Sequence, residues 1–537
     1  MKKTFTLLCA LLLSMNLMAD VADDWASNWN GVLDVAMVPE DNTSSSSFDP
    51  TATTIPITKN SDGTLNLSLE NLVLSLGDAK MYVGTVSLKN IKAAQTLVVD
   101  TTVVLQDGTD PEDASWMATM VNTACGGSVP VSILGTLNGN KMNLSIKIKI
   151  AKILGYNVAC QFGALRYASQ LPNADFEGTW TTNTKTGLFS KTTYTENTPA
   201  GWHSFYNATG DATSAAFLFS GQLGTLTKIT GYDGTGYAAQ ITSQANTLGS
   251  ISNGNLTTGV VNMGATTADD VANYNYSNIS SSDFSVRFGA MPDSVSVYVK
   301  FEPVSNESKA SMTASLHGPY NYTDPETSMA TDSVSKYKIA YASASIAPSS
   351  SWTRVCVPFS YNGENWLEWG NKEYMLVSFS TNEGKGKGAT GDKLGIDHIR
   401  FVYNSKLKSL QIDGSDVEGF DPDKTSYKIK GAYKYNVTAI ADGQGATVEQ
   451  KLVDDNTVNI IVKGGDYLSN ISNAHTYTLT FETPVGIEET KTVTEPEYVN
   501  VYTVDGVLLK KNVKAAEALE GLSKGLYVVG HKVVAVK

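Results

Sequence analysis

The feature that most constrains this fold is an alternation of apolar and polar residues that recurs along most of the 537-residue chain. It is clearest over Asp62–Leu74, DGTLNLSLENLVL, where Leu65, Leu67 and Leu69 share one face. This period of two is typical of half-buried β-strands, because successive side chains point to opposite faces of a sheet. The Asp62-Gly63 pair marks a tight hairpin turn. The sequence therefore predicts an all-β protein.

Length and charge bound the class further. At about 150 residues per domain, a chain of this length is expected to form three or four domains. The chain has 53 acidic residues against 40 basic ones, a net charge of −13. An acidic surface repels phosphate backbones, which argues against nucleic acid as a partner.

The first 19 residues have the order of a secretory signal peptide. Lys2 and Lys3 precede an apolar run, and the small residue Ala19 ends the segment. The run is shorter than the roughly 20 residues that a membrane span requires. We therefore expect cleavage before Asp20, an exported protein and no membrane span in the mature chain.

Residues 20–171 contain strand-like runs at hairpin spacing without a crossover helix. These runs are Gly31–Met37, Leu65–Leu76, Met81–Ile91, Thr96–Leu105, Val129–Leu137 and Lys141–Ile150. Together with the Trp29-Asn-Gly motif, they resemble the calycin-like, lipocalin-type domain of secreted bacterial proteins. The resemblance implies a β-barrel that either holds a small apolar ligand or, as we favour, is filled by its own side chains.

Residues 172–403 open with NADFEGTW, continue with a Gly201-Trp202 turn and close with KLGIDHIRF from Lys393. This combination resembles the family named "putative carbohydrate metabolism domain", which is similar to jelly-roll carbohydrate-binding modules. It implies a jelly-roll β-sandwich on a glycan-related protein and does not by itself imply catalysis.

Residues 404–483 contain LKSLQIDGSDVEGFDPDKTSYKI from Leu407 and resemble cadherin-like domains of bacterial surface proteins, which implies a small Ig-like sandwich. A linker rich in Glu, Thr and Pro covers 484–498. Residues 499–537 resemble the C-terminal sorting domain of type IX secretion substrates through Val501-Tyr502, Asp505-Gly506 and Gly525-Leu-Tyr527. The resemblance implies a terminal β-module that directs export from a Gram-negative bacterium to its surface or surroundings. A plain hairpin closing the preceding domain is the alternative.

Three carboxylates stand at the two ends of the jelly-roll segment: Asp175 and Glu177 on its expected first strand, and Asp397 on its last. Terminal strands of a jelly roll can be neighbours, and Ca²⁺ prefers hard oxygen ligands. The resemblance to carbohydrate-binding sandwiches therefore implies that these residues hold a structural calcium ion. The alternative is that they are ordinary carboxylates that accept hydrogen bonds in turns.

Aromatic side chains of the same segment are the candidate glycan contacts, because the apolar C–H faces of sugars pack on flat rings. Trp366 and Trp369, after the Asn362-Gly-Glu-Asn turn, are our first choices, with Trp202 as a third. The competing interpretation places most of these rings in the core, where aromatic residues contribute most to packing.

Three cysteines remain after removal of the signal segment. Cys125 and Cys160 fall in one domain, so a disulfide between them is possible. Cys356 lies on an alternating run, and we expect it to be a buried and unreactive strand residue.

Catalytic signatures are missing from the sequence. It contains no HExxH metal motif and no G-x-S-x-G nucleophile turn. The leading hypothesis is thus an exported, non-catalytic protein that binds a glycan or another surface component through 172–403. The alternatives are a glycoside-active enzyme that uses a pair of carboxylates and a structural adhesin that binds proteins.

Overall fold

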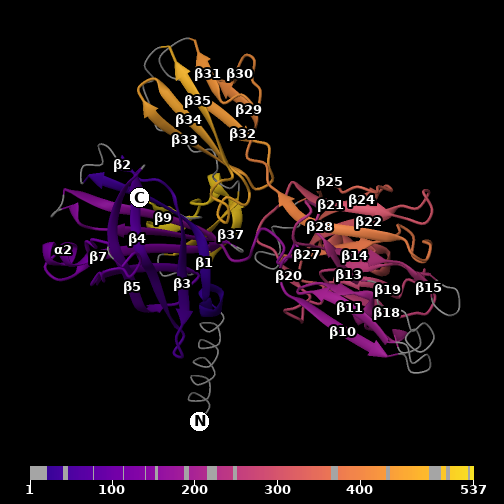
Figure 1. Ribbon diagram of the computed structural model, residues 1–537. Helices are drawn as coiled ribbons and strands as arrows, with labels where there is room; N and C mark the ends of the chain where they lie inside the picture. Colours follow the sequence, from indigo (N-terminus) through magenta and orange to yellow (C-terminus); the bar gives the residue numbers. More distant parts are fainter. Residues whose placement is uncertain are drawn as a thin grey trace. The chain divides into compact units, whose positions relative to one another are not determined.

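The protein is described by a computed structural model that covers residues 21–536 with internal gaps (Figure 1). The internal residues left out of the description are 40–45, 77, 113, 139–140, 152–154, 187–192, 214–225, 246–250, 364–372, 431–435, 483–497, 504–507 and 530–531. The chain divides into two compact units: Met1–Arg166 with Ser405–Lys537, and Tyr167–Asn404. The expected signal segment lies outside the described residues, as does nearly all of the expected linker. Of the helices described, none is long and apolar enough to cross a membrane.

The N-terminal part of the first unit is an antiparallel, nearly closed barrel in the order β5-β4-β3-β1-β9-β8-β7-β6. Its strands are β1 (Ser27–Pro39), β2 (Ser46–Ser47), β3 (Thr51–Lys59), β4 (Thr64–Leu76), β5 (Ala79–Lys92), β6 (Thr96–Val103), β7 (Val129–Asn138), β8 (Lys141–Ile148) and β9 (Tyr156–Leu165). A bridge joins Thr85 of edge strand β5 to Gln106, which follows edge strand β6, and helix α2 (Ala118–Ala124) comes next in the chain. The hairpins predicted from the alternation are thereby confirmed.

Large side chains fill the barrel. Trp25 and Trp29 are fully buried, and Phe162 is 1% exposed. They belong to one contiguous cluster of buried apolar residues that draws on every strand from β3 to β9. This packing supports the interpretation that the barrel is filled by its own side chains.

The second unit, Tyr167–Asn404, is a β-sandwich of two main antiparallel sheets. The first sheet runs β12-β17-β27-β22-β24-β26, with β20 paired to β27, and the second runs β13-β14-β28-β21-β25. The first contains β12 (His203–Ser204), β17 (Asn255–Thr257), β20 (Val286–Arg287), β22 (Ala310–His317), β24 (Lys338–Ile346), β26 (Ser360–Tyr361) and β27 (Tyr374–Ser380). The second contains β13 (Leu226–Thr230), β14 (Tyr237–Thr242), β21 (Ser294–Glu302), β25 (Thr353–Pro358) and β28 (Lys393–Val402).

Smaller elements complete this unit. They are β10 (Trp180–Thr186), β11 (Thr193–Pro199), β15 (Gln244–Ala245), β16 (Ile251–Ser252), β18 (Val260–Met263), β19 (Asn273–Tyr276), β23 (Thr323–Asp324), α5 (Thr331–Tyr337), η1 (Phe205–Asn207) and η2 (Glu326–Ser328). The core between the sheets is apolar because alternate residues point inward. Met312 and Ala314 of β22 are fully buried there, as are Leu394 and Ile396 of β28.

Residues 405–482 form two small sheets around their own core. Their strands are β29 (Leu407–Ile412), β30 (Ser415–Asp416), β31 (Ser426–Ile429), β32 (Val437–Ala441), β33 (Thr447–Asp454), β34 (Thr457–Lys463) and β35 (Ala474–Phe481). The C-terminal module has the order β37-β36-β38-β39. It consists of β36 (Tyr498–Thr503), β37 (Leu508–Lys514), η3 (Ala515–Glu517), β38 (Gly525–Val529) and β39 (Lys532–Val536). The four segments are all built from strands, as predicted.

The cysteines differ from expectation in two respects. Cys125 and Cys160 are both free thiols, so the possible disulfide is not formed. Burial raises the pKa of Cys160 to about 12, which keeps this thiol protonated. Cys356, expected to be buried, is exposed because its side chain lies on the outward face of edge strand β25.

Candidate functional site

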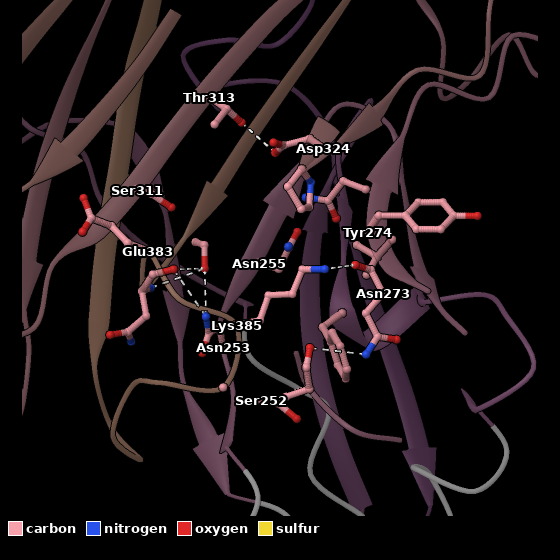
Figure 2. A pocket seen from close by; sticks show the side chains of 18 of the residues that line it. Ser252, Asn253, Asn255, Asn273, Tyr274, Ser311, Thr313, Asp324, Glu383 and Lys385 are labelled. Atoms are coloured by element: carbon pink, nitrogen blue, oxygen red, sulfur yellow. Dashed lines mark hydrogen bonds between the residues drawn. The ribbon is translucent and has the colours of Figure 1, made fainter. Parts of the chain in front are cut away.

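A pocket of about 550 Å³ lies against the first sheet of the sandwich (Figure 2). We call it the sandwich pocket. Its lining comes from β22 and β24, from the segments around Asn253 and Asn273, and from the loop that follows β27. The volume falls within the range of about 300–1,000 Å³ typical of small-molecule sites.

The floor of the sandwich pocket is polar because four strands place small polar residues on the same face. The register aligns Asn255 of β17 with Ser380 of β27, Ser380 with Ser311 of β22, and Ser311 with Ser345 of β24. A second row contains Thr257, Ser378, Thr313 and Ser343. The intervening residues Met312 and Ala314 face the core. The alternation thus builds an apolar core on one side and a row of hydroxyls and amides on the other.

Three acidic or basic side chains line the sandwich pocket among the described residues: Asp324, Glu383 and Lys385. Asp324 of β23 accepts a hydrogen bond from Thr313 Oγ1 at 2.7 Å, and Ser378 provides a further side-chain hydrogen bond. Burial raises the pKa of Asp324 above its usual value, opposed by these hydrogen bonds and by the positive charge of Lys385. Lys385 donates to the carbonyl oxygens of Asn273 at 2.5 Å and Asp270 at 3.2 Å. Figure 2 shows the Thr313–Asp324 and Lys385–Asn273 hydrogen bonds.

Two amide oxygens at the sandwich pocket have no hydrogen-bond partner among the described residues. They are the buried Oδ1 atoms of Asn253 and Asn255. The amide orientation of Asn253 is fixed because its Nδ2 donates to the carbonyl oxygen of Gly384 at 3.0 Å and also to Ser380 Oγ at 3.2 Å. Its Oδ1 is therefore an acceptor. A buried polar atom without a partner is costly, which makes these two oxygens the strongest local signal for a ligand.

Aromatic side chains border the same sandwich pocket. Tyr274 of β19 is half-buried and packs edge-on against Tyr276 at 5.9 Å between ring centroids. Tyr341 of β24 and Phe205 of η1 complete the aromatic part of the lining. The sandwich pocket thus combines flat rings with amides, hydroxyls and a half-buried carboxyl group, the groups that hold a polar ligand with apolar C–H faces.

Of the three predicted aromatic contacts, Trp202 alone falls among the described residues. Trp366 and Trp369 fall outside the described residues. The choice of Trp202 is contradicted, because its ring is only 2% exposed. It packs between Phe176 and Phe379 at centroid distances of 5.3 and 6.4 Å, and its Nε1 donates to the Asn173 carbonyl. Trp202 is a core residue, as the competing interpretation proposed.

The predicted metal ligands meet around the β13–β14 hairpin. Asp397 accepts from the backbone N–H groups of Tyr232 at 2.9 Å and His398 at 2.7 Å, and Glu177 accepts from that of Tyr237 at 2.7 Å. Asp175 Oδ2 lies 3.4 Å from the Arg400 guanidinium. Asp175 and Glu177 occupy a turn before β10 and not a strand as expected, because Asn173 and Phe176 have positive φ angles.

The three carboxylates thus face backbone donors and a guanidinium. Among the described residues, no group of three or more His, Cys, Asp or Glu side chains is arranged to hold a metal ion. Burial raises the pKa of Asp397 to about 6, and the charges of Glu177 and Asp233 add to this effect. The hydrogen bonds of Asp397 and Glu177 hold the β13–β14 hairpin. Calcium at this position stays a prediction.

The sandwich pocket was not predicted from the sequence. Its polar residues come from segments around 253, 274, 311, 324 and 383, and only strand register brings them together. One signal was available in the sequence: Ser311, Thr313 and Ser315 alternate with apolar residues. The polar face of this strand has no charged residue, which is unusual for a face exposed to solvent.

Comparisons with known proteins support the barrel. Residues 26–164 match the family model "Calycin-like beta-barrel domain". No curated protein matches the chain.

Solved structures give distant similarities that show no more than a β-rich fold. The chain is similar to "a putative glycoside hydrolase" from Bacteroides vulgatus (17% identity, 44% of this chain and 98% of that one, TM-score 0.30). It is also similar to "a putative outer membrane protein" from Bacteroides fragilis (11% identity, 68% and 99% covered, TM-score 0.17). A third similarity is to carbohydrate-binding modules of the β-sandwich superfamily (8% identity, 70% and 93% covered, TM-score 0.20).

Proposed function

We propose that the sandwich pocket binds a glycan. The observation that carries the proposal is the pair of buried amide oxygens, Asn253 Oδ1 and Asn255 Oδ1, that lack partners among the described residues inside a polar pocket. Sugar hydroxyls donate and accept hydrogen bonds, so they would satisfy these oxygens and the serine hydroxyls beside them. The apolar face of a sugar ring would pack on Tyr274.

A glycan array probed with the full-length protein tests this proposal. We expect retention of a defined set of glycans, and competition by the same glycans in solution. Absence of binding across host, plant and microbial glycans would contradict it.

A glycoside-active enzyme is the second candidate, favoured by one observation. Asp324 and Glu383 both line the sandwich pocket, and burial raises the pKa of Asp324, which suits a general acid. Incubation of the full-length protein with the array hits, followed by a reducing-sugar assay, separates the two functions. Turnover that Asp324→Asn abolishes would establish the enzyme; binding without turnover favours the binding protein.

We further propose that residues 499–537 act as an export address. The support is the resemblance of this segment to C-terminal sorting domains and its folding as a separate four-stranded sheet with its own small core. Deletion of 499–537 in the native host is expected to retain the protein in the periplasm. Unchanged surface delivery of the deletion variant would overturn this assignment.

A further inference from the structure

The charges around the sandwich pocket are unbalanced. Among the described residues that line it, Asp324 and Glu383 carry carboxyl groups and Lys385 carries the single ammonium group. Asp269 and Asp270 also act on Lys385 through their charges. Among the described lining residues, two carboxyl groups therefore stand against one cation, whose charge is also opposed by Asp269 and Asp270, and an incoming anion meets net repulsion.

Lys385 is also largely committed to the protein. Two of its three N–H donors point to the carbonyl oxygens of Asn273 and Asp270. Its ammonium charge acts on the carboxyl group of Asp324. Burial lowers the pKa of Lys385, while the charges of Asp324, Asp270 and Asp269 oppose that shift. The role of Lys385 is to tie its glycine-rich loop to β19, which leaves little of its charge for a ligand.

The side chain of Tyr341 is affected by the same negative charges. Burial raises the pKa of Tyr341 to about 12, and the charges of Asp324 and Glu326 contribute in the same direction. Tyr341 therefore remains a neutral hydroxyl at the sandwich pocket wall. Glu326 is paired with Lys338 at 2.9 Å, so that lysine is neutralised as well.

The buried atoms without a partner at the sandwich pocket include an acceptor whose orientation is fixed. Asn253 Oδ1 is fixed as an acceptor by the donation of its Nδ2 to Gly384 and Ser380, and Asn255 Oδ1 lies on the same polar face. Such oxygens require donors from a ligand. A hydroxyl group supplies a donor, whereas a carboxylate or sulfate supplies only acceptors.

From this geometry we propose that the sandwich pocket selects uncharged, hydroxyl-rich glycans and discriminates against glycans that carry carboxylate or sulfate groups. The inference rests on the proposed glycan-binding function and narrows its ligand class. Anionic glycans are rejected by the excess of carboxyl groups around the sandwich pocket.

Calorimetric titration of the full-length protein tests this selectivity. A neutral oligosaccharide identified on the array is compared with its counterpart oxidised at C6 to the uronate, which changes one hydroxymethyl group into a carboxylate. We expect the uronate to bind at least about 10-fold more weakly, with a larger ratio at low ionic strength. Asp324→Asn is expected to reduce the ratio of the Kd of the uronate to the Kd of the neutral glycan. The control Glu307→Gln, on an exposed loop of the same unit, is expected to leave this ratio unchanged.

The outcomes separate this inference from the proposed function. A uronate or sulfated glycan that binds as tightly as its neutral counterpart, or more tightly, would overturn the selectivity while glycan binding stands. Failure of every glycan, neutral or anionic, would remove the proposed function and this inference with it.

Discussion

Asp397 shows how one residue can be fitted to two different roles. The sequence places it among candidate metal ligands, and the structure gives its carboxylate two backbone donors beside a β-bulge. The next residue, His398, has a φ of 50°, which is uncommon outside glycine. The carboxylate fixes this unusual backbone by accepting the N–H of His398 and that of the facing hairpin residue Tyr232.

The raised pKa of Asp397 leads to a prediction about stability. Between its unfolded value of 3.8 and its folded value of about 6, only the folded state holds the proton. The contribution of Asp397 to stability therefore falls as pH rises through this window. Asp397→Asn removes that dependence. We expect the difference in Tm, Asp397→Asn minus the natural protein, to increase by about 2–4 °C between pH 4 and pH 7. A Tm difference independent of pH would contradict the assignment.

At the scale of elements, the β13–β14 hairpin offers a matched pair of glycines. Gly234 has a φ of 85° and open space where the methyl group of an alanine would lie, whereas a Cβ on Gly236 would overlap Glu177 Oε1. An alanine in this region of φ costs about 1–2 kcal/mol. We expect Gly234→Ala to lower the free energy of unfolding by about 1 kcal/mol. Gly236→Ala is expected to lower it by at least about 1 kcal/mol more, because this variant also loses the Glu177–Tyr237 hydrogen bond. Equal losses would show that Glu177 does not hold the hairpin.

The calcium proposal belongs to the same hairpin. A bound ion would relieve the repulsion among Asp397, Glu177 and Asp233 and would raise the melting temperature of the unit. The proposal predicts that Ca²⁺ raises Tm relative to EDTA and that Glu177→Gln abolishes the increment, with Glu307→Gln as the control. A melting temperature insensitive to Ca²⁺ and EDTA would contradict a calcium site and leave the hydrogen bonds as the sole function of these carboxylates.

The elements also show what could be predicted from sequence. The hairpin strands of the barrel followed from the alternation in Asp62–Leu74 and from the Asp62-Gly63 turn, because local period and turn chemistry determine hairpins. The sandwich pocket did not follow, because Asn255, Ser311 and Ser380 meet only through the register of β17, β27 and β22. Trp202 was misassigned because sequence alone does not distinguish a ring in the core from a ring on the surface.

At the scale of the whole molecule, the division into two compact units has a thermodynamic consequence. Units with separate cores need not unfold as one two-state system. We expect calorimetry of the full-length protein to resolve more than one transition. A bound glycan is expected to raise only the transition of Tyr167–Asn404, by mass action on its folded state. A ligand that shifts the transition of the other unit alone would place the binding site outside the sandwich.

The most direct test of glycan binding in the sandwich pocket is a calorimetric titration of full-length Asn255→Ala with a glycan retained on the array. The variant removes one of the two buried acceptor oxygens, and Asn306→Ala, an exposed asparagine of the same unit, is the control. We predict about a 10-fold higher Kd for Asn255→Ala, the equivalent of one hydrogen bond, and no change for Asn306→Ala. A Kd for Asn255→Ala equal to that of the natural protein would contradict binding in the sandwich pocket.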